Sequence, residues 1–358
     1  VMKGIKKVSY ILGKVEDDII NSTLVPAKVA IGWSSSTDIW DLALKPENSR
    51  LCGNCVYPQE RQNLYLILRH LQYPVDILSE EDLMEGYLKN YDVFILVADH
   101  LKPAAAQALK NWVQQGGTLI SVAGGGLFDN YNKPLNTLME VFGITDAKLQ
   151  KEVLALRPKL ELVHAKPLDS VVFNNINNKV IGFDIYGYRQ SFQAGSGRIL
   201  ATYKNGEPAC IENQYGKGKA IIMGFLPGPT YFKPAMPIKP YGRGGIDELQ
   251  GFVPASFTDE IPAVFRYFLS GVKSPAVCNE PLVETILRKS DTGYVLFLIN
   301  YTGKNLKNVR VTFSSEQNES VKSVMSVFST CHFRKISDGT YQIELKNLEK
   351  FDCVKITK

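Results

Sequence analysis

The sequence lacks a long apolar run and a strong charge of one sign. Its 358 residues are 45% hydrophobic and 22% charged, with a net charge of +5. No stretch approaches the roughly 18 apolar residues that a membrane-spanning helix needs. Lysine and arginine are interspersed with acidic residues rather than gathered in a basic stripe, which argues against nucleic-acid binding. We therefore predict neither a membrane span nor a nucleic-acid partner.

Cysteine is scarce, and its spacing is poor for metal binding. Of the 6 cysteines, only Cys52 and Cys55 are close together, as a CxxC pair. A tetrahedral zinc site needs further ligands, but no second CxxC and no nearby histidine pair is present. We interpret the pair as incidental loop cysteines or a local disulfide, and we predict no metal site and no cofactor.

The amino-terminal end carries no recognisable targeting signal. Its basic residues are not followed by a signal-peptide core or a cleavage site, and Val1 is not a natural start. The sequence therefore resembles a fragment or a processed chain, and it predicts no cellular location. Residues 1–25 predict a linker helix, because apolar residues recur every three or four positions along one face. This seam, which another domain or subunit would cover, comprises Ile5, Val8, Leu12, Val15 and Ile19.

Residues 26–273 alternate between short apolar runs and amphipathic segments. Strands separated by helices of this length form right-handed crossovers and a parallel sheet. The pattern predicts a flavodoxin-like or amidotransferase-like α/β domain with a doubly wound, mainly parallel sheet. A β insertion is expected at about 150–205, and a long loop at 227–254. We expect strands at 28–33, 75–78, 93–97, 118–122 and 220–225, and helices at 57–72, from Pro103, and at 259–271.

The composition changes again in residues 274–358, which form the third predicted domain. Apolar runs with turn signals between them recur roughly every ten residues, which is typical of a small antiparallel β-sandwich. These runs are 282–287, 294–300, 309–313, 321–328, 341–345 and 353–356. No catalytic cluster is evident among them.

A glycine triplet occupies the turn where many α/β enzymes carry their nucleophile. The segment Thr118–Asp129 predicts a buried strand that runs into Gly124, Gly125 and Gly126. Related hydrolases place a Cys or Ser on this strand-to-helix turn. Glycine has no side chain to react, so we predict no catalytic residue here. A phosphate held by the backbone at Gly125 stays a minor alternative, although the turn fits neither common nucleotide-binding pattern.

Acidic side chains follow several of the predicted strands. Asp38, Asp41, Asp99 and Asp129 come after strand ends, at the edge where open α/β sheets bind ligands. Aspartate at such junctions is also common as a helix cap or turn residue, and we favour that interpretation. His100 lies beside Asp99, but no Ser or Cys waits on the glycine turn to be activated by it.

Aromatic residues supply a second group of candidates, because they stack on sugar rings or pack against a partner. Trp33 is expected in the core, whereas Trp40 and the aromatics of the long loop are expected at an interface. The full set of candidate ligand-binding residues is Asp38, Trp40, Asp41, Asp99, His100, Gly125, Asp129, Tyr231, Tyr241 and Arg243.

Several short motifs, taken in order, carry a family resemblance. They are Val29–Trp33 with the later Trp40 and Asp41, Tyr57–Glu60, Pro74–Asp76, Tyr91–Ile95, Gly116–Leu119, Gly216–Gly218 and Val295–Asn300. This order resembles the carboxyl-terminal half of family 42 glycoside hydrolases. In these β-galactosidases a catalytic (β/α)8 barrel is followed by a trimerisation domain and a small β-domain. The resemblance covers most of residues 1–358 and is weakest between about 150 and 205.

The resemblance implies assembly rather than catalysis. In that family the acid/base and nucleophile glutamates lie on the barrel, and no barrel fits in this chain. The chain would then be the non-catalytic part of a glycoside hydrolase that forms a homo-oligomer, a trimer or a dimer, or that docks on an upstream barrel and shapes the sugar site. The alternative is a stand-alone carbohydrate-binding module, with its site near Ser34–Trp40 and the loop from Tyr231 to Arg243.

Overall fold

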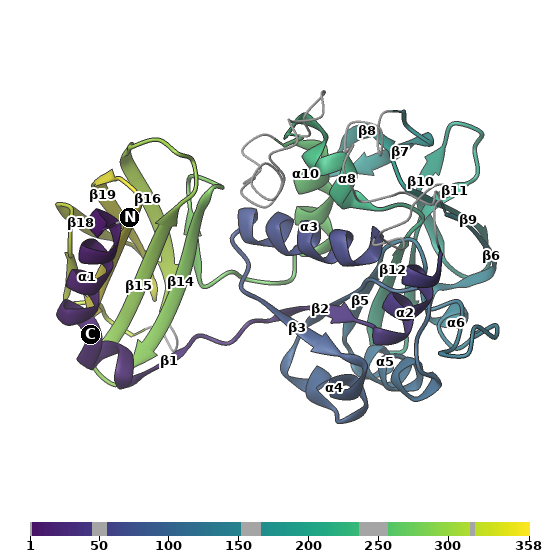
Figure 1. The fold of residues 1–358 in the computed structure, drawn as a ribbon, viewed down its shortest axis with the longest axis horizontal. Helices are drawn as coiled ribbons and strands as arrows, with labels where there is room; N and C mark the ends of the chain where they lie inside the picture. The colour runs from purple at the N-terminus through teal and green to yellow at the C-terminus, as the bar shows by residue number, and fades with distance from the viewer. Residues whose placement is uncertain (1, 45–55, 152–165, 236–256, 316–318) are drawn as a thin grey trace. The chain divides into compact units, whose positions relative to one another are not determined.

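The protein is described from a computed structural model, which covers residues 2–44, 56–151, 166–235, 257–315 and 319–358 (Figure 1). It divides into two compact units. The first comprises Val1–Ala27, Leu68–Pro74 and Lys273–Lys358, and the second comprises Lys28–Ile67 and Val75–Val272. Within the described ranges, every helix is too short or too polar to cross a membrane.

The first unit contains two antiparallel sheets that share one core. Their strand orders are β1-β14-β15-β20-β17 and β13-β16-β19-β18. Alternate residues of both sheets, such as Leu296, Phe313 and Ile343, meet in this core. The strands are β1 (Ser22–Leu24), β13 (Ala276–Cys278), β14 (Val283–Ser290), β15 (Gly293–Asn300), β16 (Leu306–Ser314), β17 (Ser323–Ser326), β18 (Cys331–Ser337), β19 (Thr340–Leu348) and β20 (Phe351–Thr357).

The predicted strands of this unit all occur, and three more are present. Strands β1, β13 and β18 have no counterpart in the predicted pattern. The sequence of β18, CHFRKIS, is largely polar because this strand lies at a sheet edge and exposes most of its residues. An edge strand needs few apolar residues, so its periodicity is weak.

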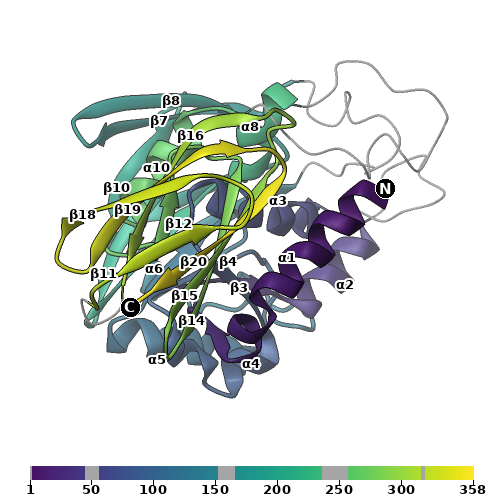
Figure 2. The same ribbon diagram turned by 90° about the vertical axis from the view of Figure 1, so that its left-hand side faces the viewer.

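Helix α1 (Met2–Ile20) covers the outer face of the five-stranded sheet (Figure 2). The predicted helix is confirmed, but its predicted buried seam is partly wrong. Ile11 and Val15 pack against Val295 and Cys353, and Ile19 packs beside them. The other predicted seam residues, Ile5, Val8 and Leu12, are exposed.

The second unit is built on a nine-stranded sheet with the order β3-β2-β4-β5-β12-β11-β10-β7-β8. Strands β3, β2, β4, β5 and β12 pair in parallel, and the remaining pairs are antiparallel. A separate ribbon pairs β6 (Ile144–Lys151) with β9 (Tyr188–Ala194). The sheet strands are β2 (Val29–Trp33), β3 (Val75–Ser79), β4 (Val93–Leu96), β5 (Thr118–Ser121), β7 (Asp169–Ile176), β8 (Lys179–Ile185), β10 (Arg198–Tyr203), β11 (Pro208–Tyr215) and β12 (Gly218–Met223).

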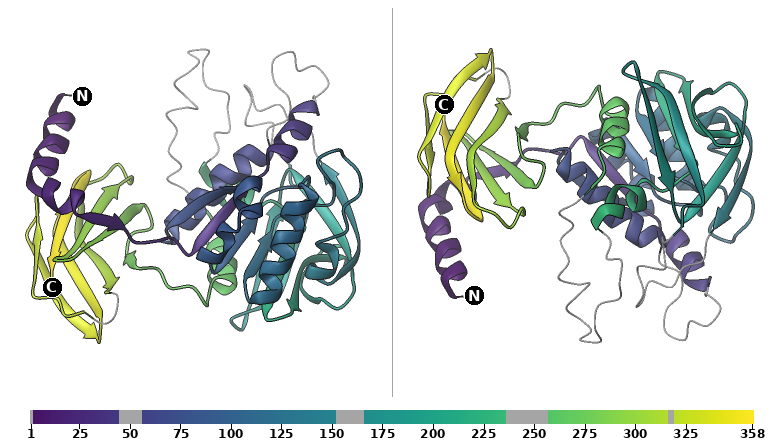
Figure 3. Two further views of the ribbon diagram at one scale, coloured as in Figure 1. Left: turned by 90° about the horizontal axis from the view of Figure 1, so that it is seen from below. Right: turned by 90° about the horizontal axis from the view of Figure 1, so that it is seen from above.

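Helices lie on both sides of this sheet (Figures 1 and 3). One core cluster joins α4, α5 and α6 to sheet residues such as Phe94, Leu119 and Ile222. Helices α3 and α10 lie on the opposite side (Figure 1). The helices and helical turns are α2 (Ser35–Ala43), α3 (Val56–His70), α4 (Glu80–Met84), η1 (Tyr87–Asn90), α5 (Pro103–Gln115), α6 (Met139–Phe142), α8 (Pro227–Phe232), η2 (Lys233–Ala235) and α10 (Glu260–Phe268).

The short helices α2, α4, α6 and α8 were not predicted. Helix α2 follows β2 directly, because the Ser34 side chain accepts a hydrogen bond from the backbone N–H of Thr37 and caps the helix. Helix α8 takes up the start of the predicted loop. Trp33 was expected in the core, and this is wrong: the residue is 47% exposed, and its indole N–H donates to Asp38.

The buried carboxylate of Glu80 joins the starts of two helices. It accepts hydrogen bonds from the backbone N–H and the hydroxyl of Ser36 in α2, at 3.2 Å and 3.0 Å. It also accepts one from the backbone N–H of Lys102, which caps α5, at 2.6 Å. A negative charge at a helix start stabilises the unpaired N–H groups there.

We predict that Glu80→Ala lowers the free energy of unfolding by about 2–4 kcal/mol, because it leaves the buried N–H of Ser36 and the part-buried N–H of Lys102 without their acceptor. Urea denaturation followed by tryptophan fluorescence measures this, since Trp33, Trp40 and Trp112 all lie in the second unit. Glu81→Ala is the matched control: its exposed carboxylate pairs with Lys102, so the change should stay within about 0.5 kcal/mol. Equal losses in both variants would contradict the role given to Glu80.

Candidate functional site

The carboxyl ends of the parallel strands bring several predicted residues together. Asp99 and His100 follow β4, the glycine triplet follows β5, and α2 begins directly after β2. This edge of the sheet is where open α/β folds bind ligands. It is also the edge that the β6–β9 ribbon approaches, because Lys151 at the end of β6 reaches Asp99.

The glycine turn is closed as well as unreactive. Gly124 has φ +129°, and a Cβ placed on it would lie 2.5 Å from the carbonyl oxygen of Ala98 and 2.6 Å from the hydroxyl of Tyr57. That hydroxyl donates to the carbonyl of Ala123 at 3.0 Å. The N–H of Gly124 donates to Gln190 Oε1 at 2.7 Å. A nucleophilic side chain would therefore find its space at Gly124 already filled.

The next two glycines face the protein interior. A Cβ on Gly125 would lie 2.7 Å from Ile222, and one on Gly126 would lie 3.3 Å from Leu138. Both neighbours belong to the main core cluster of the unit. Gly125, a predicted ligand-binding residue, thus lies against the core, and the minor phosphate alternative gains no support from its surroundings.

A buried ion pair lies beside this turn. Lys151 Nζ is 2.5 Å from Asp99 Oδ2 and 3.8 Å from Asp41 Oδ1. Both carboxylates are completely buried. Burial acts to raise the pKa of Asp99, but the hydrogen bond from His100 and the charge of Lys151 outweigh it, so this pKa lies below its usual value. Burial dominates at Asp41 and raises its pKa.

Two tyrosines surround the ammonium group of Lys151. Its Nζ lies 5.3 Å from the ring centre of Tyr57 and 5.5 Å from that of Tyr188, within the range of cation–π attraction. The hydroxyl of Tyr188 donates to Asp41 at 2.8 Å. The lysine is thus held by two carboxylates and two aromatic faces.

His100 connects the ion pair to the surface. Its Nδ1 is 2.8 Å from Asp99 Oδ1, and because a carboxylate only accepts, Nδ1 carries the hydrogen. Its Nε2 is 2.9 Å from Asn132 Oδ1. The imidazole ring stacks between Trp40 and Phe128, with centroid distances of 5.5 Å and 5.1 Å.

Asp129 organises the turn that presents Asn132. Its carboxylate accepts hydrogen bonds from the backbone N–H groups of Tyr131 and Lys133, both at 2.8 Å. Asn132 itself has φ +60°, a left-handed conformation that asparagine tolerates better than most residues. Asp129 therefore acts here as a turn residue, and its neighbour Asn132 faces the histidine.

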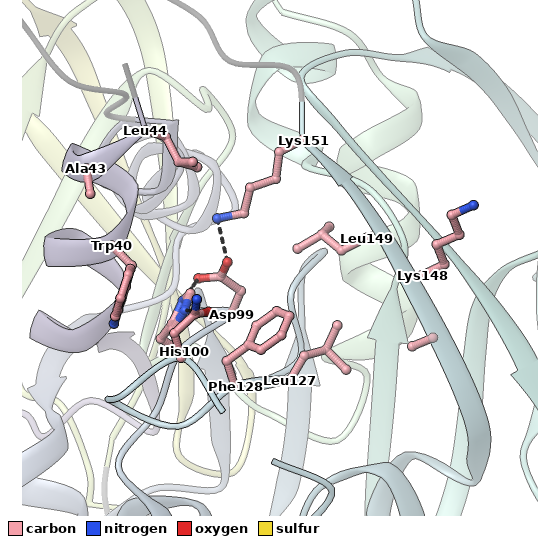
Figure 4. Close-up of a pocket in the computed structure, with 12 residues that line it drawn as sticks. Trp40, Ala43, Leu44, Asp99, His100, Leu127, Phe128, Lys148, Leu149 and Lys151 are labelled. Carbon is pink, nitrogen blue, oxygen red and sulfur yellow. Dashed lines mark hydrogen bonds and ion pairs between the residues drawn. The ribbon is translucent and has the colours of Figure 1, made fainter. Parts of the chain in front are cut away.

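Asp99, His100, Asn132 and Lys151 help to line a pocket of about 790 Å³ (Figure 4). Asp99 and His100 form its floor, and its walls come from α2 on one side and β6 on the other. The volume falls in the usual range for small-molecule sites. The lining residues are Trp40, Ala43, Leu44, Asp99, His100, Leu127, Phe128, Asn132, Ala147, Lys148, Leu149 and Lys151.

The other predicted site residues lie elsewhere. Asp38 pairs with Arg61 at 2.6 Å in the first turn of α2. Asp41 supports the ion pair but does not line the pocket. Tyr231 is buried in α8 and stacks against Phe257. Tyr241 and Arg243, like Cys52 and Cys55, lie outside the described residues.

A second buried carboxyl group lies away from the pocket. Glu60 of α3 accepts a hydrogen bond from the backbone N–H of Gly228 in α8 at 3.0 Å. Burial raises its pKa to about 8. Across the described part of the chain, no cluster of histidine, cysteine and acidic side chains could hold a metal ion.

Sequence reasoning missed the residues that complete the site. Lys151, Tyr188 and Asn132 belong to no motif, and Tyr57 was noted only as part of the family resemblance; the four come from separate segments. The alternation of Ala147, Leu149 and Lys151 along β6 was a usable signal, because residues two apart share one face of a strand.

Comparison with known proteins now identifies the domain class. The sequence model of a family described as the beta-galactosidase trimerisation domain matches residues 27–234. This match covers more than half of the chain, and the chain belongs to this family. The predicted resemblance to the trimerisation region of family 42 glycoside hydrolases is thereby confirmed. A search of curated proteins found no match.

Solved structures show the same fold. The β-galactosidase from Rahnella sp. R3 is 18% identical with a TM-score of 0.66, over 99% of this chain and 44% of that one. The β-galactosidase from Bacillus circulans sp. alkalophilus is 18% identical with a TM-score of 0.60, over 95% and 44%. Alpha-L-fucosidase isoenzyme 2 from Paenibacillus thiaminolyticus is 14% identical with a TM-score of 0.59, over 97% and 50%. The chain thus spans half or less of the length of these enzymes.

We predict that Gly124→Ala lowers the free energy of unfolding by about 3–5 kcal/mol, because the added methyl group meets the backbone at Ala98 and the Tyr57 hydroxyl. Gly206→Ala is the control: Gly206 has φ +86° but open space around it. It should cost only the backbone strain, about 1 kcal/mol. Chemical denaturation of both variants measures the difference, and equal losses would mean that the turn is not closed.

Proposed function

We propose that this chain is the non-catalytic assembly region of a β-galactosidase-like glycoside hydrolase. The observation that carries the proposal is the match to a trimerisation family over residues 27–234, which span most of the second unit. The closed glycine turn supports the non-catalytic part, because a nucleophile at Gly124 would have no space. The catalytic barrel and its glutamates would belong to a part of the parent protein outside this sequence.

We also propose a fold class for each unit. The parallel strand order β3-β2-β4-β5-β12, with helices on both sides, supports a flavodoxin-like or amidotransferase-like domain. The two sheets of the first unit with their shared core support a β-sandwich. We propose a linker helix at 1–25, the α/β domain at 26–273 and the β-sandwich at 274–358.

An exposed apolar surface on α2 suits subunit contact. Ile39 is 67% exposed and Leu42 is 49% exposed, and they lie on one face of the helix because they are three residues apart. The half-exposed Trp33 lies at the end of the preceding strand. Exposed apolar groups that cluster in this way are typical of protein contact sites. A ring of three copies would bury this surface against a different surface of the next copy.

We expect the chain to form a homo-oligomer, with a trimer as the predicted size, in light scattering at micromolar concentration. Ile39→Asp should weaken association at least tenfold, because a buried charge opposes the contact. Val180→Asp serves as the control, since Val180 is equally exposed but lies on β8, away from α2.

A monomeric unmodified chain would contradict the assembly function itself. If the oligomer persists in Ile39→Asp but is lost in Val180→Asp, the assembly function would stand. The proposed contact through the α2 surface would be contradicted.

A further inference from the structure

The pocket beside Asp99 has apolar walls and a polar floor. Ala43 at the end of α2 and Leu44 directly after it face Leu149 of β6 across the pocket, and Phe128 adds a further apolar surface (Figure 4). At the bottom lie the Asp99 carboxylate and the Lys151 ammonium group. A ligand that fills this space must offer apolar faces to the walls and hydrogen-bonding groups to the floor.

The charges at the floor are already balanced. Lys151 is paired with Asp99 at 2.5 Å and lies near Asp41. An anionic ligand would compete with these carboxylates for the lysine, and a cationic ligand would be repelled by it. Either would lose its hydration shell without gaining an unpaired counter-ion. Lys148, which also lines the pocket, points away from the floor (Figure 4).

The polar groups of the pocket suit hydroxyl groups. A hydroxyl both donates and accepts, so it can accept from the Lys151 ammonium group, whose side chain is 16% exposed, while the buried Asp99 carboxylate stays bonded to His100 and Lys151. The amide of Asn132 adds a donor and an acceptor at the rim, and Trp40 adds an aromatic surface. The C–H face of a sugar ring packs on such aromatic and aliphatic surfaces, while its hydroxyls form the hydrogen bonds.

We infer that this pocket binds an uncharged pyranose ring, with its hydroxyl edge toward Lys151 and Asn132 and its C–H faces toward the walls from α2 and β6. The site is separate from the proposed contact surface on α2, whose exposed residues Ile39 and Leu42 do not line it. Binding is therefore expected whether or not the chain assembles.

Isothermal titration calorimetry on the whole chain tests this inference with four probes: methyl β-D-galactopyranoside, methyl β-D-glucopyranoside, glucuronate and glucosamine. We expect saturable binding of at least one neutral glycoside, and binding of the two charged sugars that is at least tenfold weaker. No heat from either neutral glycoside with a folded sample would overturn the inference, and so would a preference for glucuronate or glucosamine.

Variants locate the binding in the pocket. Trp40→Ala should weaken the neutral glycoside at least tenfold, because it removes an aromatic surface. Asn132→Gly should weaken it about fivefold, since it removes one hydrogen-bonding side chain but keeps the left-handed turn. Tyr131→Ala is the matched control, because Tyr131 is 74% exposed and does not line the pocket. Circular dichroism checks folding. An unchanged affinity in folded Trp40→Ala would overturn the assignment.

Discussion

The ion pair between Lys151 and Asp99 is the interaction on which this edge of the second unit depends. Two fully buried carboxylates, Asp99 and Asp41, lie at the ends of elements that the chain brings together from separate segments. A buried charge is stable only when it is paired and hydrogen-bonded. The lysine therefore fixes the β6–β9 ribbon over the end of β4 and close to α2.

The residues around this ion pair also fill the space beside the glycine turn. Tyr57 packs beside the ammonium group, and its hydroxyl fills the space next to Gly124 where a nucleophile would project. The backbone N–H of Gly124 is also bonded, to the Gln190 side chain of the β6–β9 ribbon. What stays open is the pocket above His100, between α2 and β6. The accessible part of this edge is thus the pocket rather than the glycine turn.

Much of the fold could be predicted from the sequence, whereas most of the site could not. Buried strands such as Val93–Leu96 and helices such as Pro103–Gln115 have strong local periodicity or caps. Asp99 and His100 were predicted because they follow a strand directly. Their partner Lys151 lies far along the chain, on a partly polar strand. No local sequence pattern predicts this ion pair, because only the tertiary fold brings the residues together. The exposure of Trp33 was missed because this residue ends an otherwise buried strand, and its indole N–H donates to Asp38 of the helix that follows.

A double-mutant cycle with Asp99→Asn and Lys151→Met tests the central claim most directly. The unfolding free energies of the unmodified chain, the two single variants and the double variant give the coupling between the two side chains. We predict a coupling of at least about 2 kcal/mol, because each single variant leaves a buried charge without its partner and the double variant removes both charges. Additive losses, with a coupling below about 0.5 kcal/mol, would contradict the view that this pair organises the site.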